Sequence, residues 1–365
     1  MASYRFFDPL RVVGSTAGLV DRAVAVAMQA RARSERALAD AMSHAERIAT
    51  LAEIHLAYEG DTHIVDVARF FPAPSKVELG LRRVRPGVWE AAWPSAFEPF
   101  LAAIADRYLS RVENRTARAR FYFASPPESQ NTRPAVIAIH GYMGGQWLFE
   151  ENVWPIEWLV RSGLDVVLPV LPLHAGRAGN HRGAPGFPSA DPRVTNEGFR
   201  QAVTDIRTLV RWLRERGASK IGVMGMSLGG YTSALTATVT DEIDFVMPMI
   251  PLASIADFAR EQGRLGRTAA EEDEQHAALE RANWVVSPLA RPLAVPKSRA
   301  LVVAAEYDRI TPLSHATRLA RHFECELMTI RGGHLVQLGR SEAFRALAAM
   351  LEREGIIERR RPRSK

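Results

Sequence analysis

The chain has 365 residues, of which 47% are hydrophobic and 24% are charged. This composition is ordinary for a folded protein and excludes a disordered, a collagen-like and a disulfide-stapled chain. The formal net charge of +6 arises from 47 basic against 41 acidic residues, a small surplus on a chain of this length. The basic C-terminal residues, 356–365, carry most of it, so we predict no nucleic-acid partner.

Neither a disulfide nor a membrane span is predicted. The one cysteine, Cys325, cannot form an intramolecular disulfide, so nothing in the sequence requires an oxidising compartment. No run approaches 18 uncharged apolar residues, and charged residues interrupt the apolar N-terminal stretch, which lacks the order of a secretion signal. We therefore predict a cytoplasmic protein.

Residues 1–110 differ from the rest of the chain. Between about residues 15 and 58 there is no proline, and apolar residues recur at helical spacing, which predicts one long or two consecutive helices. We interpret them as an arm for packing or for homodimerisation, because their acidic residues disfavour a membrane surface. Residues 70–100 are rich in proline and contain Trp89 and Trp93, which predicts an ordered connector.

From about residue 117, short strand-like runs alternate with longer amphipathic segments. Several runs consist almost wholly of Val, Ile, Leu and Met, as expected of strands that are covered on both faces. A helix is predicted from about Thr195 to Arg216, with Gly217 just past its end. This alternation predicts an α/β fold with a doubly wound, mostly parallel sheet. The strand candidates are residues 117–124, 134–140, 164–170, 219–226, 243–250, 299–306 and 325–330.

Two stretches interrupt this alternation. Residues 172–193 are rich in Pro, Gly, His and Arg and predict a long loop after a strand. Residues 251–298 contain a charged, helical insertion before the strand candidate at 299–306. Long excursions at the carboxyl edge of a sheet often shape a binding site.

Ser227 lies in a G-x-S-x-G motif, flanked by Gly225 and Gly229, between a predicted strand and a predicted helix. A serine on such a sharp turn is held above the sheet edge, and side chains at the two glycines would clash across the turn. A serine hydroxyl becomes a nucleophile when a neighbouring base removes its proton. Ser227 is therefore the candidate nucleophile.

A histidine and a carboxylate follow in the order that such a mechanism needs. Asp308 follows the strand candidate at 299–306, and His334 follows the one at 325–330 in the segment RGGHL. Asp257 is an alternative acid, because it follows the preceding strand candidate. We predict a triad of Ser227, Asp308 and His334.

An oxyanion formed at the serine needs preorganised donors. One predicted donor is the backbone N–H of Leu228, and the other is that of Tyr142, with Met143 as the runner-up, in the glycine-rich loop 140–145. This loop matches neither a dinucleotide-binding motif nor a Walker A motif. We interpret His140 as a structural residue of the loop.

These motifs and their order resemble α/β-hydrolase-fold proteins of the serine esterase and lipase type, over about residues 117–353. The resemblance implies an eight-stranded sheet with a cap inserted before the strand that carries the acid, which residues 251–298 fit. We therefore divide the chain into an N-terminal helical extension and connector (1–110), a catalytic domain with its cap (111–355) and a basic tail (356–365). The resemblance covers none of the first 110 residues.

The candidates for substrate binding are His174 and Arg177 in the loop after the strand at 164–170, and Trp147 after the oxyanion loop. Arginine and histidine there could bind a carboxylate or phosphate, and the alternative is that they cap the loop and pair with surface acids. His174 and His181 lack an obvious third ligand, so no metal is predicted. We predict no cofactor either.

The resulting hypothesis is a serine hydrolase that cleaves an ester or thioester of a small to medium acyl substrate through an acyl-enzyme. An acyltransferase or a peptidase would use the same triad. A non-catalytic binding protein on this fold is the alternative of a different class.

Overall fold

The structure, a computed structural model, describes residues 42–126, 132–179 and 184–358. Its centre is a nine-stranded sheet with the order β1-β2-β3-β5-β4-β6-β7-β8-β9. Strands β1, β2, β3 and β5 pair antiparallel, and from β5 to β9 all neighbours are parallel. The strands are β1 (Gly80–Arg85), β2 (Val88–Pro94), β3 (Thr116–Tyr122), β4 (Ala135–Ile139), β5 (Asp165–Pro169), β6 (Ile221–Met226), β7 (Phe245–Met249), β8 (Leu301–Ala305) and β9 (Glu326–Ile330).

The predicted strands from 117–124 to 325–330 correspond to β3 through β9, and the mostly parallel α/β sheet is confirmed. The predicted number of eight strands is wrong, because the connector contributes a hairpin, β1–β2, to the sheet edge. In β2, Trp89 and Trp93 are buried against one core cluster, and of the alternate residues Ala92 and Pro94 are exposed while Val88 is buried on the other face. The prolines around this hairpin lie at its turn and at its end, which is where strands tolerate them.

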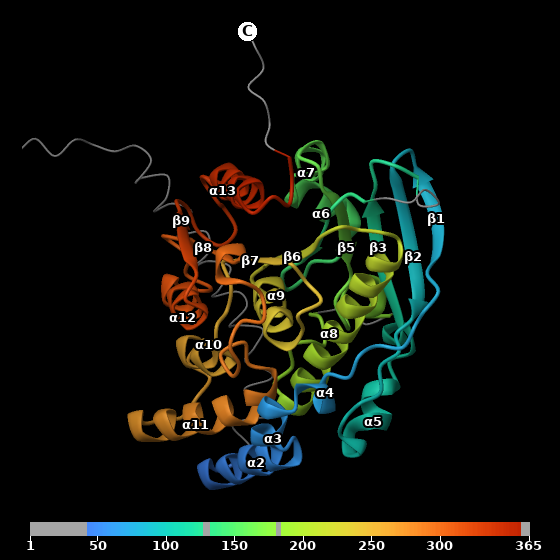
Figure 1. Ribbon diagram of the computed structural model, residues 1–365. Coiled ribbons are helices and arrows are strands. Elements are labelled where there is room, and N and C mark those ends of the chain that lie inside the picture. The colour runs from blue at the N-terminus through green and yellow to red at the C-terminus, as the bar shows by residue number, and fades with distance from the viewer. Residues whose placement is uncertain (1–41, 127–131, 180–183, 359–365) are drawn as a thin grey trace, which may run out of the picture.

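Helices cover both faces of the sheet (Figure 1). On one face lie α8 (Pro192–Glu215), α9 (Leu228–Val239) and α12 (Leu313–Phe323), and on the other lie α6 (Trp147–Val153), α7 (Ile156–Arg161) and α13 (Arg340–Arg353). The predicted helix from Thr195 to Arg216 corresponds to α8, which Asp191 caps by accepting the Arg193 N–H. Gly217 follows with a φ of +97°, a left-handed conformation that glycine adopts at low cost.

The N-terminal region packs on the rest of the chain. From residue 42 on, its helices are α2 (His44–Ala57), α3 (Gly60–Val65), α4 (Val67–Phe70) and α5 (Ala102–Leu109). Two arginines of α8 hold the end of α4 by donating to backbone carbonyls. Arg200 Nε lies 2.6 Å from Phe70 O, and Arg207 Nη1 lies 2.8 Å from Phe71 O. The part of the predicted arm before residue 42 lies outside the described residues.

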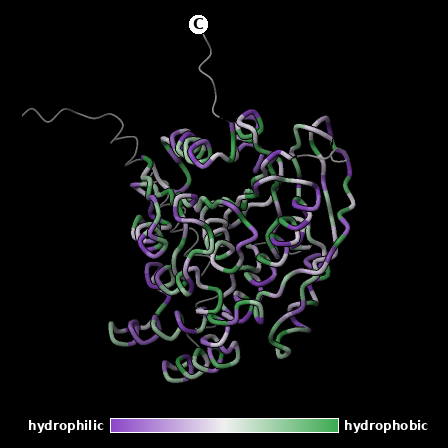
Figure 2. The backbone as a smooth tube through the Cα atoms, in the orientation of Figure 1, coloured by the Kyte–Doolittle hydropathy of each residue, from purple (hydrophilic) through white to green (hydrophobic). Residues whose placement is uncertain are grey.

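The insertion between β7 and β8 contains α10 (Ile255–Glu261), α11 (Ala269–Ala282) and two short 3-10 helices, η3 (Trp284–Val286) and η4 (Lys297–Arg299). Helix α2 packs on α11, where His44 Nε2 lies 2.8 Å from Glu274 Oε2. Both helices mix hydrophilic and hydrophobic residues along their length, as helices with one exposed face do (Figure 2).

The tail begins later than residue 356. Ile356 and Ile357 are buried against the face of the sheet that α7 and α13 cover, because their apolar side chains complete that core. Residues 359–365, which carry the basic charges, lie outside the described residues.

Candidate active site

Ser227 lies on a sharp turn between β6 and α9. Its backbone has a φ of 55° and a ψ of −114°, a region that non-glycine residues rarely occupy and that often marks functional sites. The Ser227 N–H donates to Met249 O on the next strand over 3.0 Å. A Cβ at Gly225 would lie 2.1 Å from Gly229 O, and one at Gly229 would lie 2.1 Å from Ile139 O. Glycine is therefore required on both sides of this turn.

Asp308 and His334 form a buried pair, with His334 Nδ1 2.8 Å from Asp308 Oδ2. The other carboxylate oxygen of Asp308 accepts the backbone N–H groups of Ile310 and Thr311 over 2.8 and 2.7 Å. These hydrogen bonds orient the carboxylate toward the imidazole.

Thr311 is a site residue that the sequence reasoning missed. Its hydroxyl oxygen lies 2.9 Å from Asp308 Oδ2, 3.1 Å from His334 Nδ1 and 3.0 Å from Ile250 O. The available signal was Asp308 itself, because an aspartate often closes a turn by hydrogen-bonding to the backbone that follows it. Thr311 thus connects the acid–histidine pair to the end of β7.

The loops of the pair lie against the residues that flank Ser227. Gln337 Nε2 donates to His334 O over 3.0 Å and contacts Met226 Sδ at 3.7 Å. Met249, which accepts the Ser227 N–H, directly precedes Ile250, which contacts Thr311. The structure therefore gathers the three predicted residues at one edge of the sheet, at the ends of β6, β8 and β9.

Asp257, the alternative acid, is engaged elsewhere. Its carboxylate lies 2.7 Å from His276 Nε2 and also binds the Arg318 guanidinium. Both partners lie outside the loop of His334. The structure therefore pairs His334 with Asp308.

The loop 140–145 lies beside Ser227, because a Cβ at Gly141 would be 3.6 Å from Ser227 Cβ. Tyr142 packs the edge of its ring against His174, and Met143 has a φ of 68° and is largely exposed. The Gly145 N–H donates to Glu150 Oε1 over 2.8 Å.

Two buried histidines support this loop in their neutral form. His140 Nδ1 donates to Gly141 O over 2.8 Å, and its Nε2 accepts the Leu171 N–H over 3.0 Å. Burial lowers the pKa of His140 to about 4 and that of His174 to about 3. His140 therefore has the structural role that its place in the sequence suggested.

The three candidates for substrate binding occupy different surroundings. Arg177 is 1% exposed and is tied to Asp205 Oδ2 at 2.7 Å and to two backbone carbonyls, so its charge is used inside the fold. His174 is also fully buried, and both residues support the loop that carries them. Trp147 begins α6, with the Arg120 guanidinium 4.6 Å from the centre of its ring.

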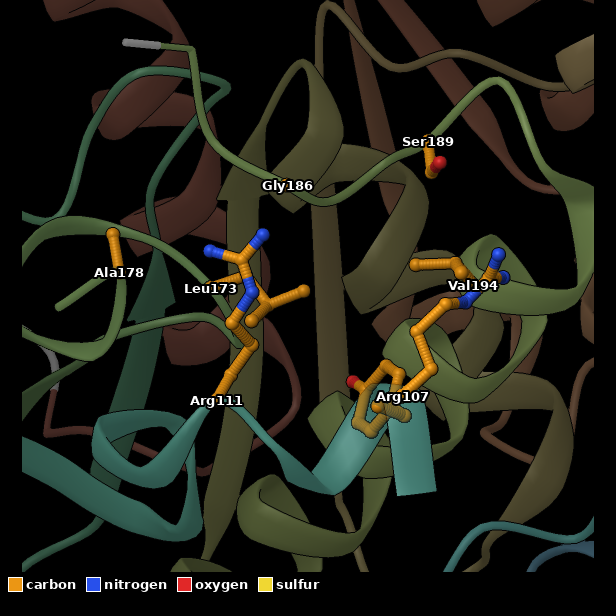
Figure 3. Close-up of a pocket in the computed structure, with 8 residues that line it drawn as sticks. Arg107, Arg111, Leu173, Ala178, Gly186, Ser189 and Val194 are labelled. Atoms are coloured by element: carbon orange, nitrogen blue, oxygen red, sulfur yellow. The ribbon is translucent and has the colours of Figure 1, made fainter. Parts of the chain in front are cut away.

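A separate pocket of about 230 Å³ opens beside the loop that contains Leu173. Figure 3 shows side chains from the end of α5 and from this loop around it, among them those of Arg107 and Arg111. Its lining includes none of the residues predicted for the chemistry. Within the described residues, no group of three or more His, Cys, Asp or Glu side chains is arranged to hold a metal ion, and no helix is both long and apolar enough to cross a membrane.

Known proteins share this architecture. Residues 95–261 match the family described as alpha/beta hydrolase domain containing 18. The uncharacterized protein Rv2627c of Mycobacterium tuberculosis H37Rv is 29% identical over 301 residues, which cover 79% of this chain and 70% of the relative. An acetyl xylan esterase from Paenibacillus sp. R4 superimposes with a TM-score of 0.55 at 14% identity, over 79% of this chain and 93% of its own.

A second solved structure, acetyl xylan esterase 1 from Thermoanaerobacterium sp. JW/SL YS485, has a TM-score of 0.52 at 17% identity, over 80% of this chain and 93% of its own. The matches agree with the mostly parallel sheet and with the helices on both of its faces. The likeness to these two structures shows that the chain has an α/β-hydrolase fold, and the family match over residues 95–261 agrees with it.

Proposed function

We propose that this protein is a serine hydrolase that cleaves a carboxylic ester or thioester of a small to medium acyl substrate. The observation that carries the proposal is the buried Asp308–His334 pair, at 2.8 Å, on the same sheet edge as the strained turn of Ser227. A serine needs an adjacent base to attack a carbonyl carbon, and the base needs an orienting acid.

In this mechanism His334 removes the proton from Ser227 Oγ as the oxygen attacks the acyl carbon. Asp308 accepts the Nδ1–H of His334 and stabilises the imidazolium that forms. The negative charge on the former carbonyl oxygen is held by the backbone N–H groups of Leu228 and Tyr142. His334 then protonates the leaving alcohol or thiol, and water cleaves the acyl-enzyme by the same steps.

The fold neighbours guide the choice of the first substrate. Two of them are acetyl xylan esterases, so an acetyl group is the acyl chain to test first. Fold alone does not decide the substrate, because superfolds host many chemistries. The cytoplasmic location and a homodimer through the N-terminal helices stay predictions.

The test combines covalent labelling with a substrate panel. The wild-type protein is expected to react with a fluorophosphonate probe and to hydrolyse p-nitrophenyl esters, with a chain-length optimum between two and eight carbons, whereas Ser227→Ala does neither. A thioester, a peptide and an added alcohol acceptor separate hydrolase from peptidase and acyltransferase. A folded wild-type protein that neither labels nor turns over any ester contradicts the proposal and favours a binding protein.

A further inference from the structure

A buried acid lies behind the loop 140–145. Glu150, on α6, is 3% exposed, and its Oε1 accepts the Gly145 N–H over 2.8 Å. Its Oε2 accepts the indole N–H of Trp154 over 3.2 Å. Both carboxylate oxygens are thus used inside the fold, one of them on the loop beside Ser227.

The backbone at the two glycines of this loop, Gly144 and Gly145, lies close to the Glu150 carboxylate. A Cβ at Gly144 would lie 2.6 Å from Glu150 Oε1, and Gly145 has a φ of +92°. The loop backbone therefore lies directly against Glu150. A shift of the carboxylate would move the Gly144–Gly145 turn, and with it the backbone N–H groups that precede it.

A charged residue from the segment that follows His334 lies over Trp154, the residue that donates to Glu150. Arg340, the first residue of α13, lies with its guanidinium 5.9 Å from the ring centre of Trp154 and 5.5 Å from that of Phe344. Burial raises the pKa of Glu150, and the Gly145 and Trp154 N–H groups and the charge of Arg340 oppose this rise. Burial also lowers the pKa of Arg340, and Glu150 opposes that shift.

We propose that Glu150 is a positioning residue for the oxyanion loop. The inference rests on the proposed function, since the loop it orders is the one assigned to oxyanion binding. The G-x-S-x-G motif and the triad order give no indication of Glu150, because it acts through the backbone of a neighbouring loop.

The experiment compares Glu150→Gln with Glu151→Gln in the full chain. Glu151 is the matched control: it is the next residue on α6, but it binds Arg85 of β1 and Arg120 and the Tyr122 hydroxyl of β3 instead of the loop. In Glu150→Gln one acceptor oxygen becomes an NH₂ group, which faces an N–H donor from either Gly145 or Trp154.

For Glu150→Gln we expect kcat to fall about tenfold or more while KM changes less than threefold, because losing an oxyanion donor outright costs about 10²–10³ in kcat. The Ki of a trifluoromethyl ketone, which forms an oxyanion at the serine, should weaken by the same factor as kcat/KM. Glu151→Gln should lower the melting temperature and leave kcat and this Ki within twofold of wild type.

Hydrogen exchange of the peptide covering 140–149 supplies a readout that needs no activity. We expect exchange to accelerate at least tenfold in Glu150→Gln and to stay near the wild-type rate in Glu151→Gln. Equal exchange in the two variants, or an unchanged kcat and Ki in Glu150→Gln, overturns the inference while the proposed function stands. An inactive, unlabelled wild type instead overturns the proposed function, and the exchange comparison still decides whether Glu150 orders the loop.

Discussion

Two aspartate–histidine pairs of nearly equal length lie in different regions of this molecule. Asp308 and His334 meet at 2.8 Å at the sheet edge, and Asp257 and His276 meet at 2.7 Å within the insertion. Asp308 is buried, and backbone N–H groups and Thr311 fill its remaining hydrogen-bonding positions. Asp257 is partly exposed and is shared with Arg318.

The surroundings separate the two pairs. Burial pushes the pKa of Asp257 up, but hydrogen bonds from His276 and Arg318 outweigh this, and the net pKa lies below its usual value. Arg318 also binds Glu280, so this pair belongs to a partly exposed ion-pair network. A short acid–imidazole distance therefore does not identify a triad. What distinguishes the pair at the sheet edge is that it shares this edge with the strained turn of Ser227 and that backbone N–H groups and Thr311 hold its acid.

The largest expected difference is in kcat/KM, when the carboxylate of Asp308 and that of Asp257 are each replaced by an amide. Asp308→Asn should lower kcat/KM for an ester about 10³–10⁴-fold, because the histidine loses the partner that fixes its tautomer and stabilises its charge. Asp257→Asn should leave kcat/KM within about twofold of wild type, since changes away from the reacting groups rarely alter the barrier. Steady-state kinetics on both folded variants measures this difference. A greater loss in Asp257→Asn would reverse the assignment of the triad acid.

A smaller effect is expected from glycine substitutions in the same two regions. Gly229→Ala should reduce the free energy of unfolding by about 3 kcal/mol or more, because its Cβ would meet the Ile139 carbonyl oxygen at 2.1 Å. Gly263→Ala, in the insertion, meets no atom within 4 Å and has a φ of +61°, so it should cost only about 1–2 kcal/mol. Urea unfolding at pH 7 measures both. Equal losses of unfolding free energy in the two variants would show that crowding at the Ser227 turn is not the reason that glycine is required there.

A further expected effect is a dependence of the free energy of unfolding on pH, which arises from the buried, neutral histidines near the sheet edge. Burial lowers the pKa of His140 from 6.5 to about 4, so the unfolded chain binds a proton there before the folded one does. The free energy of unfolding should therefore fall by about 2 kcal/mol per such histidine between pH 7 and pH 5.

His174 should contribute similarly, because burial lowers its pKa to about 3. His174→Asn can keep a donor near Pro172 O, so this variant should lose about half of the difference that the two histidines produce. Urea unfolding at both pH values measures it. An unchanged pH dependence in the variant would show that His174 is not held neutral by the fold.

Much of the fold and part of the site could be predicted because their signals are local. Strands β4 through β8 are short apolar runs between turn residues. The motif G-x-S-x-G indicates a sharp backbone turn from only five consecutive residues. The hairpin β1–β2 could not be predicted in this way, because Trp89 and Trp93 form a strand face only against a core built from distant residues.

The order of residues in the chain alone determined the three candidate catalytic residues. Parallel strands end at the same edge of a sheet, so the residues that follow β6, β8 and β9 must approach one another. Only the tertiary structure decided which acid His334 takes, that Arg177 and His174 are used inside the fold, and that Glu150 and Thr311 support the two loops. The physical reason is that hydrogen bonds and burial depend on distances between segments far apart in the chain, which no local pattern records.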